Sequence, residues 1–343
     1  MTRWAVVLAG GVGSRFWPLS TPQRPKQLLP LVDGEPLLRN TLDRLAPLVP
    51  AAQTLVLTNA GLVAAIAALA PELPAENIIA EPRPAGTAAA LAFAAAVIVK
   101  RAGPTATMLC VHADWSVGNP EEFRRRLAEA GSLAEQHASL VTVGVVPSRP
   151  DPGFGYIQPG EVVEGDARRV VRFVEKPSRE VAERMVRDGY LWNSGIFVWR
   201  AGDLLDEVRA HTPEVAPALA AGTDINAFFA IAKSVSVDVG VLERSARVMV
   251  LPGNFGWDDV GTWSSLRRIR ERDGAGNAFN GEVYAVESQG NVVHAEGGAV
   301  VLYGVSDLVV ITRDGLTVVT TIDRAVDLKK LVDALPGEVR DRR

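Results

Sequence analysis

Residues 4–31 read WAVVLAGGVGSRFWPLSTPQRPKQLLPL, and this segment decides which fold class the chain is expected to adopt. An apolar run typical of a buried strand leads into a loop with three glycines, Gly10, Gly11 and Gly13. Two cations follow, Arg15 and Lys26. Glycine lets backbone N–H groups approach a polyanion, and both cations complement phosphate oxygens. We therefore predict a strand followed by a phosphate-binding loop, with a glycine-rich surface turn as the alternative.

The glycine pattern differs from two well-known nucleotide-binding loops. The dinucleotide fingerprint G-x-G-x-x-G needs a third glycine at position 16, where this chain has Phe16. A Walker A loop ends in Gly-Lys-Ser or Gly-Lys-Thr, and no such ending occurs here. The missing third glycine argues against a nicotinamide-dependent oxidoreductase, which is the alternative from a different enzyme class.

Short apolar runs alternate with helical patterns through the first half of the chain. Strands are expected at 4–10, 54–59, 77–81, 106–114 and 139–147, and helices at 36–48, 60–70, 87–100 and 120–137. This alternation predicts an α/β fold, with a Rossmann-like, mostly parallel sheet and helices on both faces. Ligands bind at the carboxyl ends of the strands in such sheets, so we expect the glycine loop, Asn59, Glu81 and Asp114 at one rim.

The second half of the chain has a different sequence pattern. Hairpin-like segments begin after residue 150, and helices are expected at 178–188, 201–232 and 264–272. GAGNAFNG (274–281) is typical of a linker, and the short strand-like pieces after it suggest a small β-solenoid or compact sheet. We predict a catalytic domain at 1–265, a small β-helix-like domain at 274–335 and a frayed C terminus.

Composition excludes several classes of function. The 343 residues carry a formal net charge of −4, which gives no sign of a nucleic-acid surface. The single cysteine, Cys110, excludes an internal disulfide framework and a cysteine-based zinc cluster. The N-terminal apolar run is too short for a secretory signal, and no stretch reaches the roughly 18 apolar residues of a membrane span. We expect a cytoplasmic protein with no nucleic-acid and no membrane partner.

Three carboxylates are candidates for binding a metal ion. Asp114 ends an apolar strand, and the turn GNFGWDDVGTW (253–263) contains Asp258 and Asp259. Two carboxylates together with phosphate oxygens and water make a typical Mg²⁺ site. Taken by itself, Asp114 is better explained as a helix N-cap, and its interpretation as a metal ligand depends on a second carboxylate that can meet it.

Two later motifs carry polar groups at the ends of strands. FVEKP (173–177) contains Glu175 and Lys176, for which a salt-bridged edge strand is the alternative explanation. WNSGIF (192–197) places Asn193 between an aromatic residue and a glycine, where its amide suits sugar hydroxyls or a turn. The four histidines have no metal-ligand spacing, and we interpret them as structural.

The order of these motifs resembles that of the sugar-1-phosphate nucleotidyltransferases. LAGGVGSRFWPLS, RPKQ, HAD, GFGYI, FVEKP, WNSGIF and WDDVGTW follow one another, and the resemblance extends over about residues 3–335, including the β-helix-like end. Within this family the motifs are most similar to those of mannose-1-phosphate guanylyltransferases. The resemblance implies that GTP and mannose 1-phosphate are the substrates, GDP-mannose and pyrophosphate the products and Mg²⁺ the metal. A homodimer is the assembly we consider.

The resemblance also implies a role for each site residue. Arg15 and Lys26 are expected to be catalytic, stabilising the triphosphate and the leaving pyrophosphate, while Asp114 and Asp259 hold Mg²⁺. The residues expected around the nucleotide are Leu8, Gly10, Gly11, Gly13, Glu81, Gly86 and Thr87. Those expected around the sugar phosphate are Gly155, Glu175, Lys176 and Asn193.

Two other functions stay open at this point. A thymidylyl- or adenylyltransferase acting on glucose 1-phosphate would share the fold, and so would a non-catalytic nucleotide-sugar sensor. Guanylyl members of the family often read R-N-T-A-P-A where this chain has AGTAAA at 85–90, so the base assignment depends on other residues. The joint presence of Arg15, Lys26, Asp114 and Asp259 argues against the sensor.

Overall fold

The structure is a computed structural model that describes residues 2–11 and 14–340. Contacts divide the chain into two compact units. The first contains the described part of Met1–Gly10 together with Thr41–Ala113 and Asn119–Trp257. The second contains the described parts of Gly11–Asn40 and Asp258–Arg343 together with Asp114–Gly118. Each unit is described below by itself.

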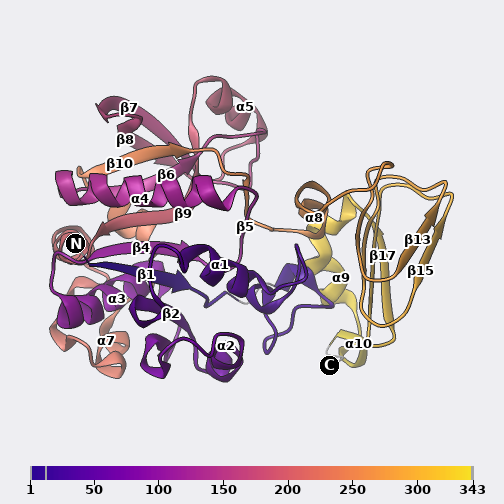
Figure 1. Ribbon diagram of the computed structural model, residues 1–343, viewed down its shortest axis with the longest axis horizontal. Helices are drawn as coiled ribbons and strands as arrows, with labels where there is room; N and C mark the ends of the chain where they lie inside the picture. The colour runs from indigo at the N-terminus through magenta and orange to yellow at the C-terminus, as the bar shows by residue number, and fades with distance from the viewer. Residues whose placement is uncertain (1, 12–13, 341–343) are drawn as a thin grey trace. The chain divides into compact units, whose positions relative to one another are not determined.

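A nine-stranded sheet in the order β3-β2-β1-β4-β9-β6-β10-β8-β7 forms the centre of the first unit (Figure 1). Its strands are β1 (Arg3–Leu8), β2 (Thr54–Asn59), β3 (Ile78–Glu81), β4 (Thr107–His112), β6 (Leu140–Val145), β7 (Tyr156–Glu164), β8 (Ala167–Val174), β9 (Leu191–Arg200) and β10 (Val248–Gly253). The pairs β1–β2, β1–β4, β2–β3 and β6–β10 are parallel, whereas β9 runs antiparallel to both β4 and β6. The predicted Rossmann-like sheet is confirmed, with an antiparallel strand inserted at its centre.

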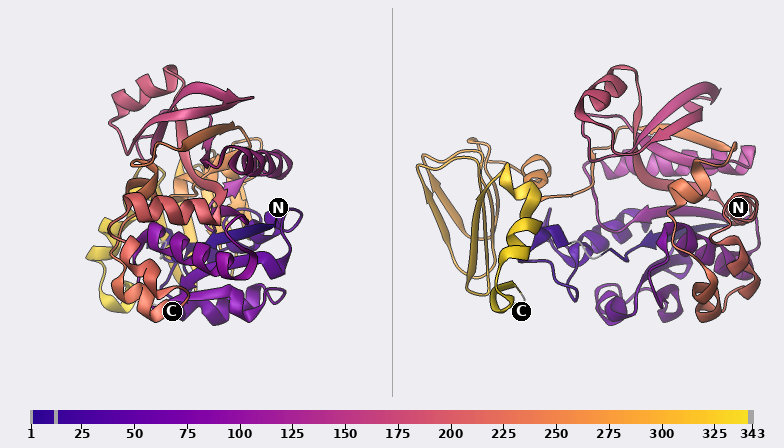
Figure 2. Two further views of the ribbon diagram at one scale, coloured as in Figure 1. Left: turned by 90° about the vertical axis from the view of Figure 1, so that its left-hand side faces the viewer. Right: turned by 180° about the vertical axis from the view of Figure 1, so that it is seen from behind.

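Helices cover both faces of this sheet (Figure 2). They are α1 (Leu37–Leu45), α2 (Val63–Leu69), α3 (Gly86–Ala102), α4 (Pro120–His137), α5 (Arg179–Arg187), α6 (Ala201–His211) and α7 (Ile225–Ile231), followed by a π-helix at Asp238–Leu242. Helix α3 packs against β1 and α6, and α4 packs against β4, β6 and β9. Helix α4 begins where its sequence predicts, because the Asn119 side chain accepts the N–H of Glu122 and Pro120 occupies the first turn.

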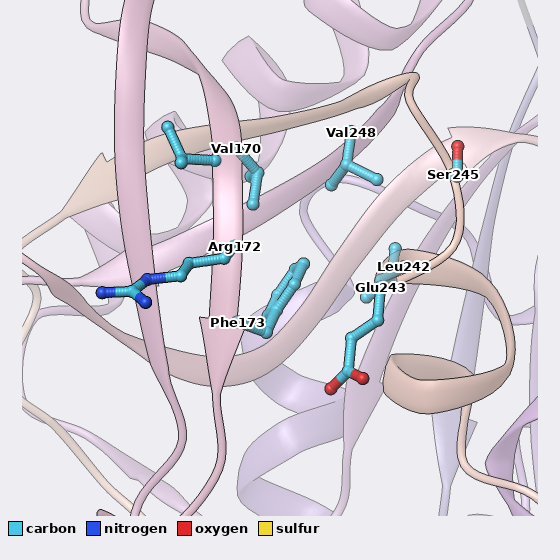
Figure 3. A pocket seen from close by; sticks show the side chains of 8 residues that line it. Val170, Arg172, Phe173, Leu242, Glu243, Ser245 and Val248 are labelled. Atoms are coloured by element: carbon cyan, nitrogen blue, oxygen red, sulfur yellow. The ribbon is translucent and has the colours of Figure 1, made fainter.

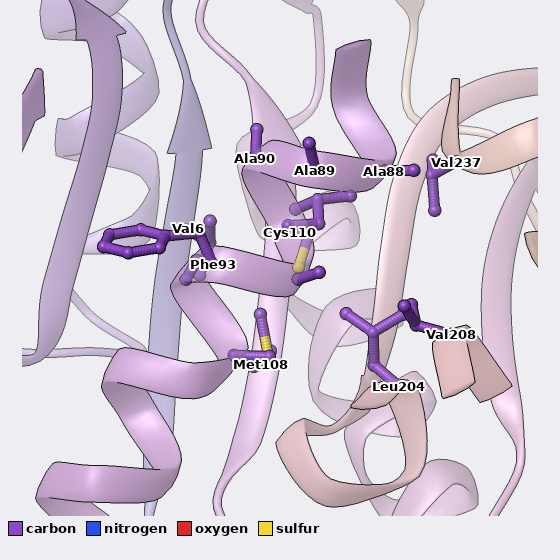
Figure 4. Close-up of a cluster of buried hydrophobic side chains, with 14 of the residues drawn as sticks. Val6, Ala88, Ala89, Ala90, Phe93, Met108, Cys110, Leu204, Val208 and Val237 are labelled. Carbon is purple, nitrogen blue, oxygen red and sulfur yellow. The ribbon is translucent and has the colours of Figure 1, made fainter. Parts of the chain in front are cut away.

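The main hydrophobic core of the first unit lies between the sheet and helix α3. Val6 and Cys110 from neighbouring strands point toward alanines of α3 and toward Leu204 of α6 (Figure 4). Cys110 is fully buried, and its burial raises the pKa of the thiol well above the ordinary value. The thiol is therefore part of the hydrophobic core. Because alanine side chains are short, α3 packs closely on the strands whose ends carry the predicted nucleotide residues.

The second unit contains the β-helix-like part of the chain. Its strands are β12 (Ala278–Asn280), β13 (Val283–Val286), β14 (Val292–Ala295), β15 (Val300–Tyr303), β16 (Leu308–Arg313) and β17 (Leu316–Thr321), and its helices are α8 (Trp263–Ile269), α9 (Leu328–Ala334) and α10 (Gly337–Arg340). Two short strands, β5 (Ser116–Val117) and β11 (Trp257–Asp258), stand apart from these. Successive turns stack in parallel, with Ala278 beside Val292 and Val292 beside Val309, and β17 closes the stack antiparallel to β16. The small predicted β-solenoid is thereby confirmed.

The segment after the glycine loop shares its core with this β-helix. Phe16, Trp17 and Leu29 are buried in one cluster with Val309 and Ile311. Polar contacts add to this packing, because Nη1 of Arg313 donates to the carbonyl oxygens of Pro18 at 3.1 Å and Leu19 at 2.8 Å. Arg24 forms an ion pair with Glu296 at 3.3 Å. The unit is therefore built from two segments that are far apart in sequence.

Two expectations about local structure were wrong. The segment 274–281 is only partly a linker, since Ala278–Asn280 is strand β12 and pairs with β14. Within the residues predicted to be frayed, Gly337–Arg340 form helix α10, and the indole N–H of Trp17 donates to the carbonyl of Arg340 at 3.0 Å. The predicted domain boundary between residues 265 and 274 does not coincide with the two compact units. That boundary was predicted from which residues are expected to carry the activity, and it stays a prediction.

Candidate functional site

The four residues predicted for phosphate and metal binding belong to the second unit and lie on three of its segments. Nζ of Lys26 donates to Oδ2 of Asp114 at 3.2 Å and to the carbonyl oxygen of Asp259 at 2.5 Å. Nη1 of Arg15 donates to the carbonyl oxygen of Gly261 at 3.4 Å, in the turn that carries Asp259. The structure therefore brings both cations to the WDDVG turn and one of them to Asp114.

Lys26 is held in a defined position by its surroundings. Its side chain is only 9% exposed, whereas that of Asp114 is 39% exposed. Pro25 precedes a short 3₁₀ helix at Lys26–Leu28, and Nε2 of the neighbouring Gln27 donates to the carbonyl of Gly11 at 2.9 Å. This contact ties the end of the glycine loop to the lysine segment. Gly13, predicted to contact the nucleotide, lies outside the described residues.

The two aspartates of the WDDVG turn have different environments. Asp258 is 4% exposed, and its carboxylate accepts from Nη2 of Arg268 at 2.9 Å and from the backbone N–H of Val260 at 3.0 Å. Asp259 is half-buried, and a side chain at Gly261 would meet its Oδ2. Val260 adopts a left-handed conformation, with φ of 48°, which is rare for a β-branched residue. Asp258 therefore stabilises the turn, and Asp259 is the better candidate for a metal ligand.

The donor set of this unit fits Mg²⁺. Mg²⁺ in phosphate-transfer sites is held by one or two carboxylates, with substrate phosphates and water completing the shell. Asp114 and Asp259 supply two carboxylates on segments that Lys26 links. Within residues 2–11 and 14–340, no three His, Cys, Asp or Glu side chains form a cluster suited to a metal. This arrangement suits a metal that depends on the substrate for most of its ligands.

The predicted nucleotide residues of the first unit lie at the ends of neighbouring elements. β1 ends at Leu8, and a Cβ atom at Gly10 would lie 3.9 Å from Oε1 of Glu81. Helix α3 begins at Gly86, where φ is 79° and a side chain would overlap the backbone of Val235. The Oγ1 of Thr87 accepts the backbone N–H of Val237 at 2.8 Å. Thr87 thus supports the fold, while its own O–H stays available as a donor.

Glu81 is the most strongly perturbed carboxylate in this group. Burial at the carboxyl end of β3 raises its pKa from 4.5 to about 7. A poorly solvated carboxylate gains stability when a ligand supplies hydrogen-bond donors. A group with a perturbed pKa next to a bare glycine backbone is a candidate for ligand recognition.

The predicted sugar-phosphate residues form a second group in the first unit. The N–H of Asn193 donates to the carbonyl of Gly155 at 2.8 Å, and a Cβ atom at Gly155 would lie 2.7 Å from Oε2 of Glu175. The same carboxylate forms an ion pair with Lys176 at 2.9 Å between Nζ and Oε1. Lys176 has φ of 44°, a conformation that non-glycine residues adopt rarely. The tip of the Glu175 side chain therefore lies directly against the backbone of Gly155, and because this side chain is 60% exposed it can move.

Sequence reasoning missed one residue of this group. Nδ2 of Asn193 donates to Oδ1 of Asp238 at 2.7 Å. Asp238 begins the π-helix Asp238–Leu242, a rare element that is frequently found at functional sites. The segment SVSVDVG (234–240) resembles an ordinary strand or loop in sequence, so no local pattern identified it.

A separate recess lies beside the end of the same π-helix. Its volume is about 240 Å³, and its lining includes Val170, Phe173, Leu242, Glu243 and Val248 (Figure 3). None of the predicted site residues lines it. Burial, together with the negative charges of Asp238 and Glu175, raises the pKa of Glu243. We assign this recess no part in the reaction.

Comparisons with known proteins agree over nearly the whole chain. A mannose-1-phosphate guanylyltransferase of Salmonella muenchen and one of Escherichia coli K12 are both 37% identical to it, over 98% of this chain and 74% of theirs. A Thermus thermophilus structure, described as a mannose-1-phosphate geranyltransferase, superposes with a TM-score of 0.89 and 37% identity, covering 97% of this chain and 99% of that one. In the part of the chain that the structure describes, no helix is long and apolar enough to cross a membrane.

Two family descriptions match consecutive parts of the sequence. Residues 281–335 match the MannoseP isomerase/GMP-like β-helix domain, in agreement with the stacked strands of the second unit. Residues 4–275 match the nucleotidyl transferase description, and this match includes every predicted site residue. The chain therefore belongs to the nucleotidyl transferase family.

Proposed function

We propose that the protein transfers the guanylyl group of GTP to mannose 1-phosphate, forming GDP-mannose and pyrophosphate. The single observation that carries this proposal is the buried Lys26 ammonium, which contacts both Asp114 and the Asp259 segment. Such a centre is suited to a reaction between polyanions. Identity of 37% to mannose-1-phosphate guanylyltransferases over 98% of the chain supports the choice of substrates.

The reaction joins two negatively charged molecules. An oxygen of the sugar phosphate attacks the α-phosphorus of GTP, and the bond from that phosphorus to the β-phosphate bridging oxygen breaks. The electron pair of this bond leaves with pyrophosphate, so charge develops on the leaving group. Catalysis therefore depends on positioning and on neutralising charge. Lys26, whose side chain is nearly buried, would neutralise this charge from a fixed position. Arg15, which is exposed, would contribute a second positive charge.

Asp114 and Asp259 are proposed to hold Mg²⁺ together with the phosphate oxygens of GTP. When bound, Mg²⁺ withdraws charge from the phosphate oxygens and thereby eases attack at phosphorus. Lys26 balances part of the negative charge of Asp114, with which it forms an ion pair at 3.2 Å. Asp258 has no part in this proposal because Arg268 already neutralises it.

Glu81 is proposed to recognise the guanine base. Guanine presents two adjacent donors, N1–H and the exocyclic N2–H, to which a carboxylate is complementary. Adenine has an acceptor at N1, and thymine has one donor between two carbonyl groups. The buried carboxylate of Glu81 would be left without those donors if another base were bound, and that loss is costly. Gly10, Gly11, Gly86 and Leu8 would contribute backbone contacts to the same nucleotide.

The sugar phosphate is proposed to contact Glu175, Lys176, Asn193 and the backbone of Gly155. Lys176 is 67% exposed at its side chain and is suited to the sugar's phosphate, while Glu175 accepts from hydroxyl groups. Asn193 offers both a donor and an acceptor to the sugar. A homodimer and a cytoplasmic location are part of the same proposal.

One assay tests the whole proposal. Pyrophosphate release is measured for GTP, ATP, UTP and dTTP, each with mannose 1-phosphate and with glucose 1-phosphate. We expect the highest kcat/KM for GTP with mannose 1-phosphate, and loss of activity when EDTA removes Mg²⁺. If dTTP or ATP exceeds GTP by more than about tenfold, the guanylyl assignment fails while the nucleotidyltransferase assignment survives.

A further inference from the structure

The side-chain amide of Asn193 contacts a carboxylate from a distant part of the chain. Its Nδ2 donates to Oδ1 of Asp238 at 2.7 Å. Its Oδ1 accepts, at 3.4 Å, from the backbone N–H of Gly195, on the same strand. Asp238 comes from a segment 45 residues further along the chain. A long-range contact of this kind orients the amide independently of strand β9.

Carboxylates and amides differ in a way that makes this contact directional. An ionised carboxylate only accepts hydrogen bonds, whereas an asparagine amide has a donating nitrogen and an accepting oxygen of nearly equal size. The amide nitrogen must therefore face Asp238, and the amide oxygen must face the other way. Without Asp238, only the 3.4 Å contact from the N–H of Gly195 would oppose a rotation of the amide by about 180°, which exchanges donor and acceptor at little steric cost.

Asp238 is itself fixed by the backbone on either side of it. The N–H of Val237 donates to Oγ1 of Thr87 at 2.8 Å, and Val237 is buried. The carbonyl of Asp238 accepts the N–H of Glu243 at 2.8 Å, which closes the π-helix. The carbonyl of Val235 accepts the N–H of Ala88 at 3.2 Å. The backbone that carries the Asp238 carboxylate is therefore held in place by hydrogen bonds on both sides of this residue.

We propose that Asp238 is a positioning residue for sugar recognition and acts through Asn193. By fixing the amide, Asp238 places one donor and one acceptor at defined points. Sugars such as mannose and glucose, which differ in the direction of one hydroxyl group, require such a defined arrangement to be distinguished. The inference rests on the proposed function, because it assigns Asn193 to the sugar phosphate.

The test compares variants of Asp238 in the full chain. kcat and KM are measured for mannose 1-phosphate and glucose 1-phosphate at saturating GTP, and KM for GTP at saturating mannose 1-phosphate. We expect Asp238→Ala to lower kcat/KM for mannose 1-phosphate by about 10- to 100-fold and to reduce the preference for mannose. KM for GTP and the Tm should not change. Asp238→Glu should restore part of the activity, since it keeps an acceptor.

Two controls separate positioning from other effects. Asp206→Asn removes one exposed carboxylate from helix α6 in the same unit, and all kinetic constants should match the wild type. Glu243→Gln removes a neighbouring carboxylate that has no hydrogen bond to Asn193, and the sugar preference should be kept. If Glu243→Gln lowers the preference as much as Asp238→Ala does, charge rather than amide orientation is responsible, and the inference is overturned.

A double-mutant cycle provides the decisive readout. Asp238→Ala added to Asn193→Ala should cause no further loss, because a positioning residue has nothing left to orient. An equal loss in both backgrounds, no loss in either, or equal effects on GTP and sugar would overturn the inference. If the alanine variant does not fold, Asp238→Asn replaces it, because an amide at this position can donate as well as accept and no longer fixes which atom of Asn193 faces it. A wild-type enzyme inactive with GTP and mannose 1-phosphate would instead overturn the proposed function.

Discussion

Lys26 combines burial with two contacts that fix its ammonium group. A positive charge that is already in position needs little reorganisation when pyrophosphate leaves. Losing one such contact reduces the rate by about 10²–10³-fold. We therefore expect Lys26→Ala to lower kcat by this factor and to leave the folded structure intact, as followed by circular dichroism. The control is Lys329→Ala, an exposed lysine of helix α9. Near-normal turnover in Lys26→Ala would remove the assigned role.

Asp258 and Asp259 are neighbours in sequence, but we expect Asp259 to bind the metal and Asp258 to stabilise the fold. Asp259→Asn should lower activity and raise the Mg²⁺ concentration that gives half-maximal rate, because a metal-binding carboxylate is replaced by an amide. Asp258→Asn should lower the Tm instead, since it breaks the ion pair between the buried Asp258 carboxylate and the half-exposed Arg268. Measuring both variants over a Mg²⁺ titration and a thermal melt distinguishes the two roles. The reverse assignment of effects would show that Asp258 is the ligand.

Glu81 predicts a pH dependence whose sign follows from its raised pKa. Its pKa is about 7 in the folded protein and 4.5 as the ordinary value, so its protonated form is favoured by folding. The associated stability is complete below pH 4.5 and is lost as the pH rises through about 7. Glu81→Gln should therefore have a Tm above that of the wild type at pH 8, with the difference shrinking toward pH 5. A constant difference between pH 5 and 8 would contradict the raised pKa.

At the scale of elements, the segment after the glycine loop depends on strands of the β-helix. Arg24 pairs with Glu296, Glu296 contacts His294, and Nδ1 of His294 lies 3.0 Å from Nη2 of Arg270. Arg270 also donates to the carbonyl of Leu31 at 2.7 Å. This buried chain of polar contacts joins residues 24–31 to strand β14, and burial lowers the pKa of Arg270 to about 10, which leaves it charged at neutral pH.

His294 gives this network a pH dependence. Burial and the charge of Arg270 lower its pKa from 6.5 to about 4, so the imidazole is neutral in the folded protein. The unfolded chain binds the proton first on acidification, so the stability is complete above pH 6.5 and is lost as the pH falls toward about 4. We expect the free energy of unfolding to fall by ~1–3 kcal/mol more in the wild type than in His294→Asn over this interval. Urea unfolding at pH 7.5 and 4.5 tests this, and equal falls would contradict it.

Local patterns in the sequence predicted most single elements correctly, because apolar runs and helix caps act over a few residues. Strand β2 (Thr54–Asn59) and helix α4 (Pro120–His137) occur at the predicted residues. The antiparallel insertion of β9 and the contact between Asn193 and Asp238 depend on pairing between distant segments, which no local pattern encodes. The same holds for Lys26 and Asp259. Their proximity could be predicted only from the family resemblance.

At the scale of the whole molecule, the division into compact units changes what is expected of the β-helix. The sequence predicted a catalytic domain at residues 1–265 and a separate β-helix-like domain at 274–335. In the structure, the segment that carries Arg15 and Lys26 belongs to the same compact unit as Asp258–Arg343. Large buried side chains such as Phe16 and Leu29 face β-helix residues such as Val309 and Ile311 in one core.

A chain that ends at Asp273 would test this dependence. It lacks the strands that bury Phe16 and Trp17, and exposing such side chains costs about 1.5–3 kcal/mol each. We expect the truncated chain to fold poorly or to bind GTP at least tenfold more weakly, as measured by calorimetry. A chain that ends at Arg340 keeps the contact between Trp17 and that residue and should behave as the full chain does. Arg313→Ala in the full chain removes the two contacts to Pro18 and Leu19, together with the ion pairs to Glu296 and Asp314, and should give an intermediate loss of kcat. If residues 1–273 bind GTP and turn over mannose 1-phosphate normally, the predicted domain boundary at residue 265 is right and the shared core is dispensable.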